Sequence, residues 1–147
     1  MKIVPAWFAS ICLLAFLSSP LPAQTEQAPA EQKSLVGTWS GTDNRGEAGT
    51  LVLNADGSAD MIRNGVSLKE SVVKTNGTIT YRFSAESTPA QFDFTVARSD
   101  GKLLTMLGIA EFQPDGALKV RLVRSGTRPV DFNGPPEETI LLRKKED

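Results

Sequence analysis

The feature that most constrains the fold is a series of short runs in which apolar and polar residues alternate and which end at turn sequences. The apolar members of the two clearest runs are Ile79, Tyr81 and Phe83, and Phe92, Phe94 and Val96. Successive side chains of a β-strand point to opposite faces, so each run has one apolar face and one face that meets water. We expect the two apolar faces to share one interior.

Turn sequences divide the chain from residue 35 onward into about nine runs, and no window of about 11 residues has helical spacing. Asp-Gly and Asn-Gly pairs, which favour tight turns, occur at Asp56-Gly57, Asn64-Gly65, Asn76-Gly77, Asp100-Gly101 and Asp115-Gly116. The pattern predicts strands over residues 37–42, 49–54, 58–63, 66–75, 78–84, 92–96, 102–112, 118–122 and 139–143. Gly108, inside the longest run, predicts a bulge or a sharp bend.

The strand pattern predicts an all-β fold, an antiparallel up-and-down β-barrel of about 8 to 9 strands. Nearly every connection between neighbours is a hairpin, and a closed meander leaves no exposed sheet edge. A sandwich of two sheets is the alternative. The first and last strands of a closed meander pair with each other, so we expect residues 37–42 to lie beside residues 139–143.

The first 23 residues predict an export signal. Lys2 provides a positive start, an apolar run follows from Ile3 to Leu17, and Ala23 is a small residue suited to cleavage. Pro5 interrupts the run, which is shorter than the roughly 18 residues of a membrane-spanning helix. Residues 24–34 predict a flexible leader and residues 35–147 a single domain. We therefore expect an exported protein, periplasmic or secreted, without stable membrane insertion once the signal is removed.

The residue types that carry most nucleophilic and metal chemistry are missing from the predicted mature chain. The sequence has no histidine, and its one cysteine, Cys12, lies in the predicted signal. A formal net charge of −1 provides no field that would attract nucleic acid. Asp93, Glu111 and Asp131 are the carboxylates best placed for acid–base work, but we expect them to be outward strand residues or loop caps. The sequence thus predicts neither an enzyme nor a cofactor or metal site.

Aromatic residues are the candidates for lining a ligand cavity inside the barrel, namely Tyr81, Phe83, Phe92, Phe94 and Phe112. A barrel of about eight strands can hold one small ligand or can be filled by its own side chains, and both possibilities stay open. The leading function is the binding of a small apolar or amphipathic ligand in the barrel. The alternative is an envelope interaction or inhibitor protein that uses exposed loops around a filled core.

Several segments resemble known lipocalin-type proteins. Leu35-Val36-Gly37-Thr38-Trp39 resembles the Gly-x-Trp start of lipocalin-type barrels. An uncharacterised family of exported bacterial lipocalin-like (calycin-type) proteins is similar in the blocks Gly108-Ile109-Ala110-Glu111-Phe112, Asp115-Gly116, Leu118-Lys119-Val120, Arg128-Pro129-Val130-Asp131-Phe132 and Ile140-Leu141-Leu142-Arg143-Lys144. The resemblance covers residues 35 to 145 and implies a lipocalin-like barrel, without an activity to carry over.

The same resemblance implies how the barrel end is closed. Lipocalin-type barrels that open with Gly-x-Trp commonly lay an arginine over the indole ring, a contact that contributes roughly 0.5 to 2 kcal/mol. Arg143, near the end of the last strand, is the expected partner of Trp39. Arg128, in the preceding loop, is the competing partner.

Overall fold

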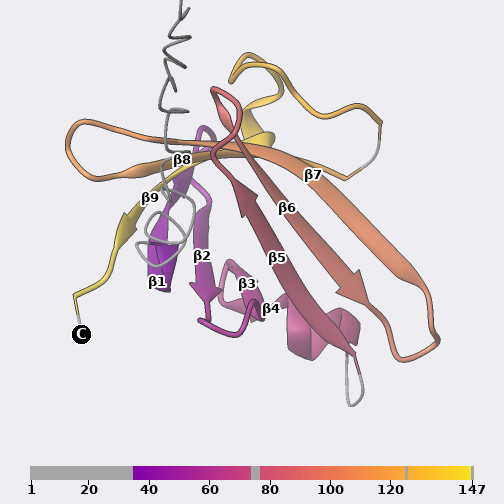
Figure 1. Ribbon diagram of the computed structural model, residues 1–147. Helices are drawn as coiled ribbons and strands as arrows, with labels where there is room; N and C mark the ends of the chain where they lie inside the picture. Colours follow the sequence, from indigo (N-terminus) through magenta and orange to yellow (C-terminus); the bar gives the residue numbers. More distant parts are fainter. Residues whose placement is uncertain (1–34, 74–76, 125, 147) are drawn as a thin grey trace, which may run out of the picture.

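The described residues form an antiparallel sheet that curls strongly on itself (Figure 1). The computed structural model describes residues 35–73, 77–124 and 126–146, so the predicted signal, the leader and Asn76 lie outside the described residues. The strands are β1 (Gly37–Asp43), β2 (Ala48–Leu53), β3 (Ala59–Arg63), β4 (Val66–Ser67), β5 (Thr78–Ser84), β6 (Ala90–Ala97), β7 (Leu103–Phe112), β8 (Leu118–Val123) and β9 (Thr139–Lys144). Their order in the sheet is β4-β3-β2-β1-β9-β8-β7-β6-β5. The predicted all-β antiparallel meander is confirmed.

The first and last strands pair, as the sequence predicts. β1 runs antiparallel to β9 along the stretch from Trp39 to Asp43. Gly41 permits this approach, because a Cβ atom there would collide with the backbone oxygen of Leu141. The two ends of the folded chain therefore meet in the middle of the sheet.

The sheet is open between β4 and β5, the two strands at its edges. Among the described residues the opening is bridged at one end, where Ser58, just before β3, forms an isolated bridge with Thr80 of β5. Beside that bridge the Tyr81 N–H donates to the Gly57 oxygen at 2.9 Å. The fold is therefore a strongly curled half-barrel whose opening lies between β4 and β5.

The predicted strand over residues 66–75 is wrong for residues 68–73, and residues 74 and 75 lie outside the described residues. β4 ends at Ser67, and a π-helical turn, η1 (Lys69–Val73), follows. The Asp60 carboxylate accepts hydrogen bonds from the Ser67 hydroxyl at 2.7 Å and from the Lys69 N–H at 3.1 Å. Such side-chain bonds offer the backbone an alternative to the sheet ladder, so the chain turns away before a longer strand can form.

Helical structure in the described ranges is short. η1 has five residues, and a 3-10 turn, η2 (Pro136–Glu138), has three. No helix of these ranges is long and apolar enough to cross a membrane.

The apolar faces of β5 and β6 form the densest part of the core. Its most buried side chains are Ile79, Tyr81, Phe92, Phe94 and Val96. Phe83 is partly buried against them, and the ring centroids of Phe92 and Phe94 lie 4.7 Å apart. The prediction that these faces share one interior is confirmed.

Trp39 lies at the end of this core, and its indole is 2% exposed. Its Nε1 donates to the Leu35 oxygen at 2.7 Å, and the Phe112 ring centroid is 6.2 Å from the indole. The ammonium of Lys144 lies 5.7 Å from the indole centroid. The cation over the tryptophan ring is therefore a lysine rather than an arginine.

The predicted contact of Trp39 with Arg143 or Arg128 is wrong. Lys144 is directly opposite Trp39 in the ladder, so the two side chains share a face. Arg143, one residue earlier, is opposite Ser40 and points to the other face, where it bonds to an aspartate of the β7–β8 turn at 2.6 Å. Alternation along β9 thus selects Lys144, and Arg128 is engaged elsewhere.

Gly108 interrupts the ladder between β6 and β7. Of the two predicted features, a bulge or a sharp bend, the bulge is absent. The register is the same on both sides of Gly108, since Ala90 pairs with Ala110 and Phe94 pairs with Met106. No extra residue is therefore inserted. The ladder instead lacks the pairs that would join Phe92 to Gly108 and Asp93 to Leu107.

Asp93 and Arg128 take the place of the missing ladder bonds. The Gly108 N–H donates to Asp93 Oδ1 at 3.1 Å, and the Gly108 oxygen accepts from Arg128 Nη1 at 2.7 Å. Arg128 Nη2 bonds to Asp93 Oδ2 at 2.7 Å, and the hydrogen bond with Asp93 raises the pKa of Arg128. A Cβ atom at Gly108 would collide with the Phe92 oxygen. At Gly108, β6 and β7 lie too close together for a residue with a Cβ atom. The Asp93–Arg128 pair therefore supplies the hydrogen bonds that the ladder lacks there.

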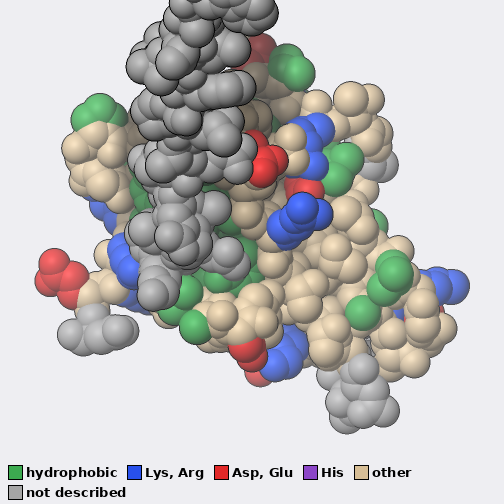
Figure 2. All heavy atoms as spheres, viewed as in Figure 1, with side chains coloured by type: hydrophobic (Ala, Val, Ile, Leu, Met, Phe, Trp, Pro, Cys, Tyr) green, Lys and Arg blue, Asp and Glu red, His purple; other side chains and the backbone are tan. Residues whose placement is uncertain are grey.

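Cations also hold the rest of the loop after β8, drawn in yellow in Figure 1, against the outward side chains of β8. Arg121 donates to the Asp131 oxygen at 3.0 Å and bonds to the Glu138 carboxylate at 2.9 Å. The Lys119 ammonium lies 4.7 Å from the Phe132 ring centroid. Figure 2 shows basic and acidic side chains interspersed on the face that it presents. Charged side chains of β8 therefore tie this loop to the sheet.

Truncation of Phe94 to alanine should lower the free energy of unfolding by roughly 3 to 5 kcal/mol, because a buried ring is lost and a cavity is left. Leu103→Ala is the control, since that side chain is 71% exposed and its removal should cost no more than about 0.5 kcal/mol. Urea denaturation measures both. A loss below about 1 kcal/mol for Phe94→Ala would show that this ring is not part of a packed core.

The ladder-replacing pair can be tested by a double-mutant cycle of Asp93→Ala and Arg128→Ala. Both side chains are largely buried, at 22% and 26% exposed, and their contact is bidentate. We therefore expect a coupling free energy of about 1 to 3 kcal/mol in denaturant unfolding. A coupling near zero would mean that the pair does not hold the loop to the sheet.

Candidate functional site

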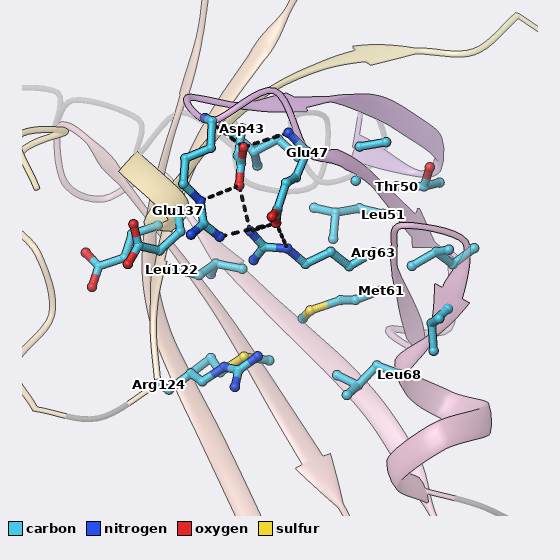
Figure 3. Close-up of a pocket in the computed structure, with 18 of the residues that line it drawn as sticks. Asp43, Glu47, Thr50, Leu51, Met61, Arg63, Leu68, Leu122, Arg124 and Glu137 are labelled. Atoms are coloured by element: carbon cyan, nitrogen blue, oxygen red, sulfur yellow. Dashed lines mark hydrogen bonds and ion pairs between the residues drawn. The ribbon is translucent and has the colours of Figure 1, made fainter. Parts of the chain in front are cut away.

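A pocket of about 700 Å³ opens on the concave side of the sheet (Figure 3). Its floor is apolar and consists chiefly of Leu51, Met61, Leu68, Met106, Leu122 and Ile140. Its rim is charged and consists of Asp43, Arg45, Glu47, Arg63, Arg124, Glu137 and Glu138. This size and this division between floor and rim are typical of sites for small molecules.

Strand alternation positions the floor. Leu51 of β2 stands directly opposite Met61 of β3, and directly opposite side chains share a face. Figure 3 shows both beside the open space of the pocket. The floor lacks the aromatic rings that pack between β5 and β6, so this part of the half-barrel is left hollow.

Four side chains, from the end of β1, the β1–β2 loop and the end of β3, form a network at the rim. Arg63 approaches Asp43 at 2.6 Å and Glu47 at 2.8 Å. Arg45 approaches Glu47 at 3.2 Å. Figure 3 draws these contacts above Leu51 and Met61. Two arginines offset two carboxylates, so the network is a fixed, nearly neutral edge of the pocket.

Asp43 is the anchor of this network, with a side chain only 4% exposed. Its Oδ1 accepts the backbone N–H of Arg45 at 2.8 Å and that of Glu47 at 2.9 Å. Burial by itself raises the pKa of Asp43, but these N–H donors and the charges of Arg63 and Arg45 together hold it below its ordinary value of 3.8. Asp43 is therefore ionised at neutral pH and fixes the loop at the rim.

The remaining rim charges differ in their pairing. Glu138 is bound to Arg121 at 2.9 Å. Arg124 has no ion-pair partner in the part of the chain that the structure describes. Figure 3 shows Arg124 extending from the end of β8 into the pocket. It is the rim cation best placed to meet a polar group of a bound molecule.

The pocket is not lined by the five aromatic residues that were predicted to line a ligand cavity. These residues are Tyr81, Phe83, Phe92, Phe94 and Phe112. Phe92 and Phe94 are fully buried against neighbouring rings. Phe112 packs beside Trp39 and is 41% exposed. The aromatic part of the interior is thus filled, because its rings are large enough to meet, and the pocket lies in the aliphatic part.

The three carboxylates considered for acid–base work are not brought together as a catalytic group. Asp93 is paired with Arg128 on the outer side of β6. Asp131 accepts the backbone N–H of the residue two positions later and lies 3.5 Å from Arg121. Glu111 is an exposed strand residue. Within the described ranges, no three acidic, histidine or cysteine side chains gather in a way that could hold a metal ion.

The aromatic residues predicted to line a cavity did not indicate this pocket, because its floor consists of aliphatic side chains and methionines. Met61 and Met106 occupy inward positions of their strands, which the alternation of β3 and β7 could have indicated. No local pattern in the sequence indicated the network of charged residues at the rim. The network joins residues up to 20 positions apart, and the register of β2 against β3 is what brings Arg63 to the β1–β2 loop.

The rim anchor predicts a pH dependence. The folded pKa of Asp43 lies below its ordinary value, so ionised Asp43 stabilises the fold above that value, and this contribution is lost as pH falls through the folded pKa. Native protein should be more stable than Asp43→Asn at about pH 6, and the difference should shrink toward about pH 2.

Urea denaturation of both proteins across this range measures that difference. Asp56 and Asp115 also have lowered pKa values, through hydrogen bonds with Ser58 and Arg143 respectively. Both residues are present in each protein, so their effects cancel. A difference that stays constant with pH would contradict a stabilising role for the charge of Asp43.

Comparison of the chain with models of protein families, with curated proteins and with solved structures found no match in any of the three. The function of the protein is therefore inferred from the geometry of the pocket.

Proposed function

We propose that this protein is an exported binding protein that holds a small amphipathic molecule in the pocket. The observation that carries the proposal is a space of about 700 Å³ with an apolar floor and a charged rim. The floor would take up the nonpolar part of the molecule through the hydrophobic effect. The rim would keep its polar part beside charged groups and water. Export rests on the signal predicted from residues 1–23.

Methionines in the floor favour a ligand with a flexible or variable nonpolar part. Met61 and Met106 line the pocket from β3 and β7. A methionine side chain is unbranched and polarizable, so it adapts to different shapes. The pocket should therefore accept a range of related nonpolar groups rather than one rigid outline.

The proposed role is binding without a chemical step. The rim carboxylates Asp43 and Glu47 are both held by Arg63, so they form part of the structure of the rim. Arg124 can contribute a hydrogen bond or a charge to the polar end of the ligand.

Filling the pocket should abolish binding. The amphipathic fluorophore 1-anilinonaphthalene-8-sulfonate should bind the native protein saturably with increased emission, because its rings leave water. Met61→Trp, which places an indole in the space beside Leu51, should raise the dissociation constant by at least about tenfold. Fluorescence titration measures the change.

The control for that substitution is Leu103→Trp, which adds the same ring at an exposed position of β7. It should bind the fluorophore as the native protein does. Equal binding by Met61→Trp and native protein would contradict the pocket as the site. Native mass spectrometry of protein purified from its own host provides a second check, since a carrier should retain or accept a ligand of defined mass.

A further inference from the structure

β7 is longer than its neighbour β8 and continues past it. The last pair between them joins Leu107 to Val123. Residues Leu103–Met106 are paired with β6 on one side, and no described strand pairs with their other side. We call this stretch the β7 edge.

Backbone groups at the β7 edge point outward at every second residue. The Arg98 N–H donates to the Lys102 oxygen at 2.9 Å, so the Lys102 oxygen faces β6. Because backbone groups alternate along a strand, Leu103 and Thr105 direct their N–H and C=O groups toward the open side. None of these four groups is hydrogen-bonded to a described residue.

The β7 edge also lacks the usual protection of a sheet edge. Proteins commonly cover exposed edges or interrupt them with charges, proline or a bulge. Here Leu103 is 71% exposed and Leu104 is 37% exposed, and residues 103–106 contain neither a charge nor a proline. The edge of β5 is different, because its Tyr81 N–H is already bonded across the opening.

We propose that the β7 edge binds an extended polypeptide segment of a partner protein as an added strand. Outward N–H and C=O groups on alternate residues are the pattern that another strand's backbone complements. A partner side chain opposite Leu104 would share the inner face with Met106, which lines the pocket, so an apolar residue fits there. Two cations flank the edge and favour acidic residues beside it. Lys102 lies 3.9 Å from Asp100 but its side chain is 76% exposed, and Arg124 has no ion-pair partner among the described residues.

A second copy of this chain fits the β7 edge less well than a separate segment. If two copies paired antiparallel through Leu103 and Thr105, Lys102 of the second copy would stand opposite Met106. Its hairpin turn would then enter the position beside Leu107 that Val123 of β8 already holds. A linear segment that ends at this point avoids the clash. The backbone groups that carry the inference belong to Leu103 and Thr105, which do not line the pocket. The inference therefore does not depend on the small-molecule proposal, although Met106 and Arg124 border both sites.

The test is an amide NMR titration of the full chain with two peptides, acetyl-Glu-Val-Thr-Val-Glu-amide and its lysine counterpart, acetyl-Lys-Val-Thr-Val-Lys-amide. The acidic peptide should cause saturable shift changes centred on Leu103 to Met106, at lower concentration than the basic peptide does. Thr105→Pro removes an outward N–H at a position where an edge strand tolerates proline. It should weaken binding at least about fivefold, whereas Thr105→Val, which keeps the N–H, should bind like the native protein.

Anilinonaphthalenesulfonate binding by Thr105→Pro reports that the fold and the pocket persist. Loss of peptide binding at the β7 edge is therefore distinguishable from loss of ligand binding in the pocket. If that variant does not fold, an acidic peptide with N-methylated amides provides the same test and should not bind. Three results would overturn the inference: no shift changes at Leu103 to Met106, equal binding by the proline variant, or shift changes there that depend on protein concentration without peptide. The last result would assign the edge to a second copy.

Discussion

The pairing of β1 with β9 is the constraint on which the form of the sheet depends. It places both ends of the folded chain in the middle of the strand order, so the free edges of the sheet fall at β4 and β5. β4 is only two residues long, because Ser67 and Lys69 donate local hydrogen bonds to the Asp60 carboxylate and direct the chain into η1. A full closing ladder therefore cannot form there. The half-barrel keeps a wide interior, and the pocket occupies the part of it that large side chains do not fill.

Two kinds of side chain divide that interior. β5 and β6 contribute aromatic rings that meet at centroid distances such as 4.7 Å between Phe92 and Phe94, and they pack without leaving space for a ligand. The strands that face the pocket contribute leucines, isoleucines and methionines instead. The same alternation of inward residues thus produces a solid half and a hollow half. The size of the inward side chains decides which half is which.

The contacts of Arg128 on the outer side of the sheet explain why the first residues of β7 have no neighbouring strand on one side. Arg128 must reach Asp93 and Gly108 on β6 and β7, so the chain leaves the direction of β8 soon after Val123. That departure places Arg124 at the pocket rim and leaves Leu103 to Met106 without a paired strand. One ion pair inside the ladder therefore shapes both the proposed binding pocket and the proposed docking edge.

The sequence by itself determined the local features of this fold. Alternation gave the inward faces of β5 and β6, and Asn64-Gly65 forms the expected tight turn with φ values of 50° and 80°. These features follow from the sterics of neighbouring residues. The tertiary structure decided which distant residues meet: Lys144 instead of Arg143 at Trp39, Arg63 at the β1–β2 loop, and Arg128 in the β6–β7 ladder. A shift of one residue in strand register exchanges the two faces of a strand, so such contacts depend on pairing across the whole sheet, which no local pattern specifies.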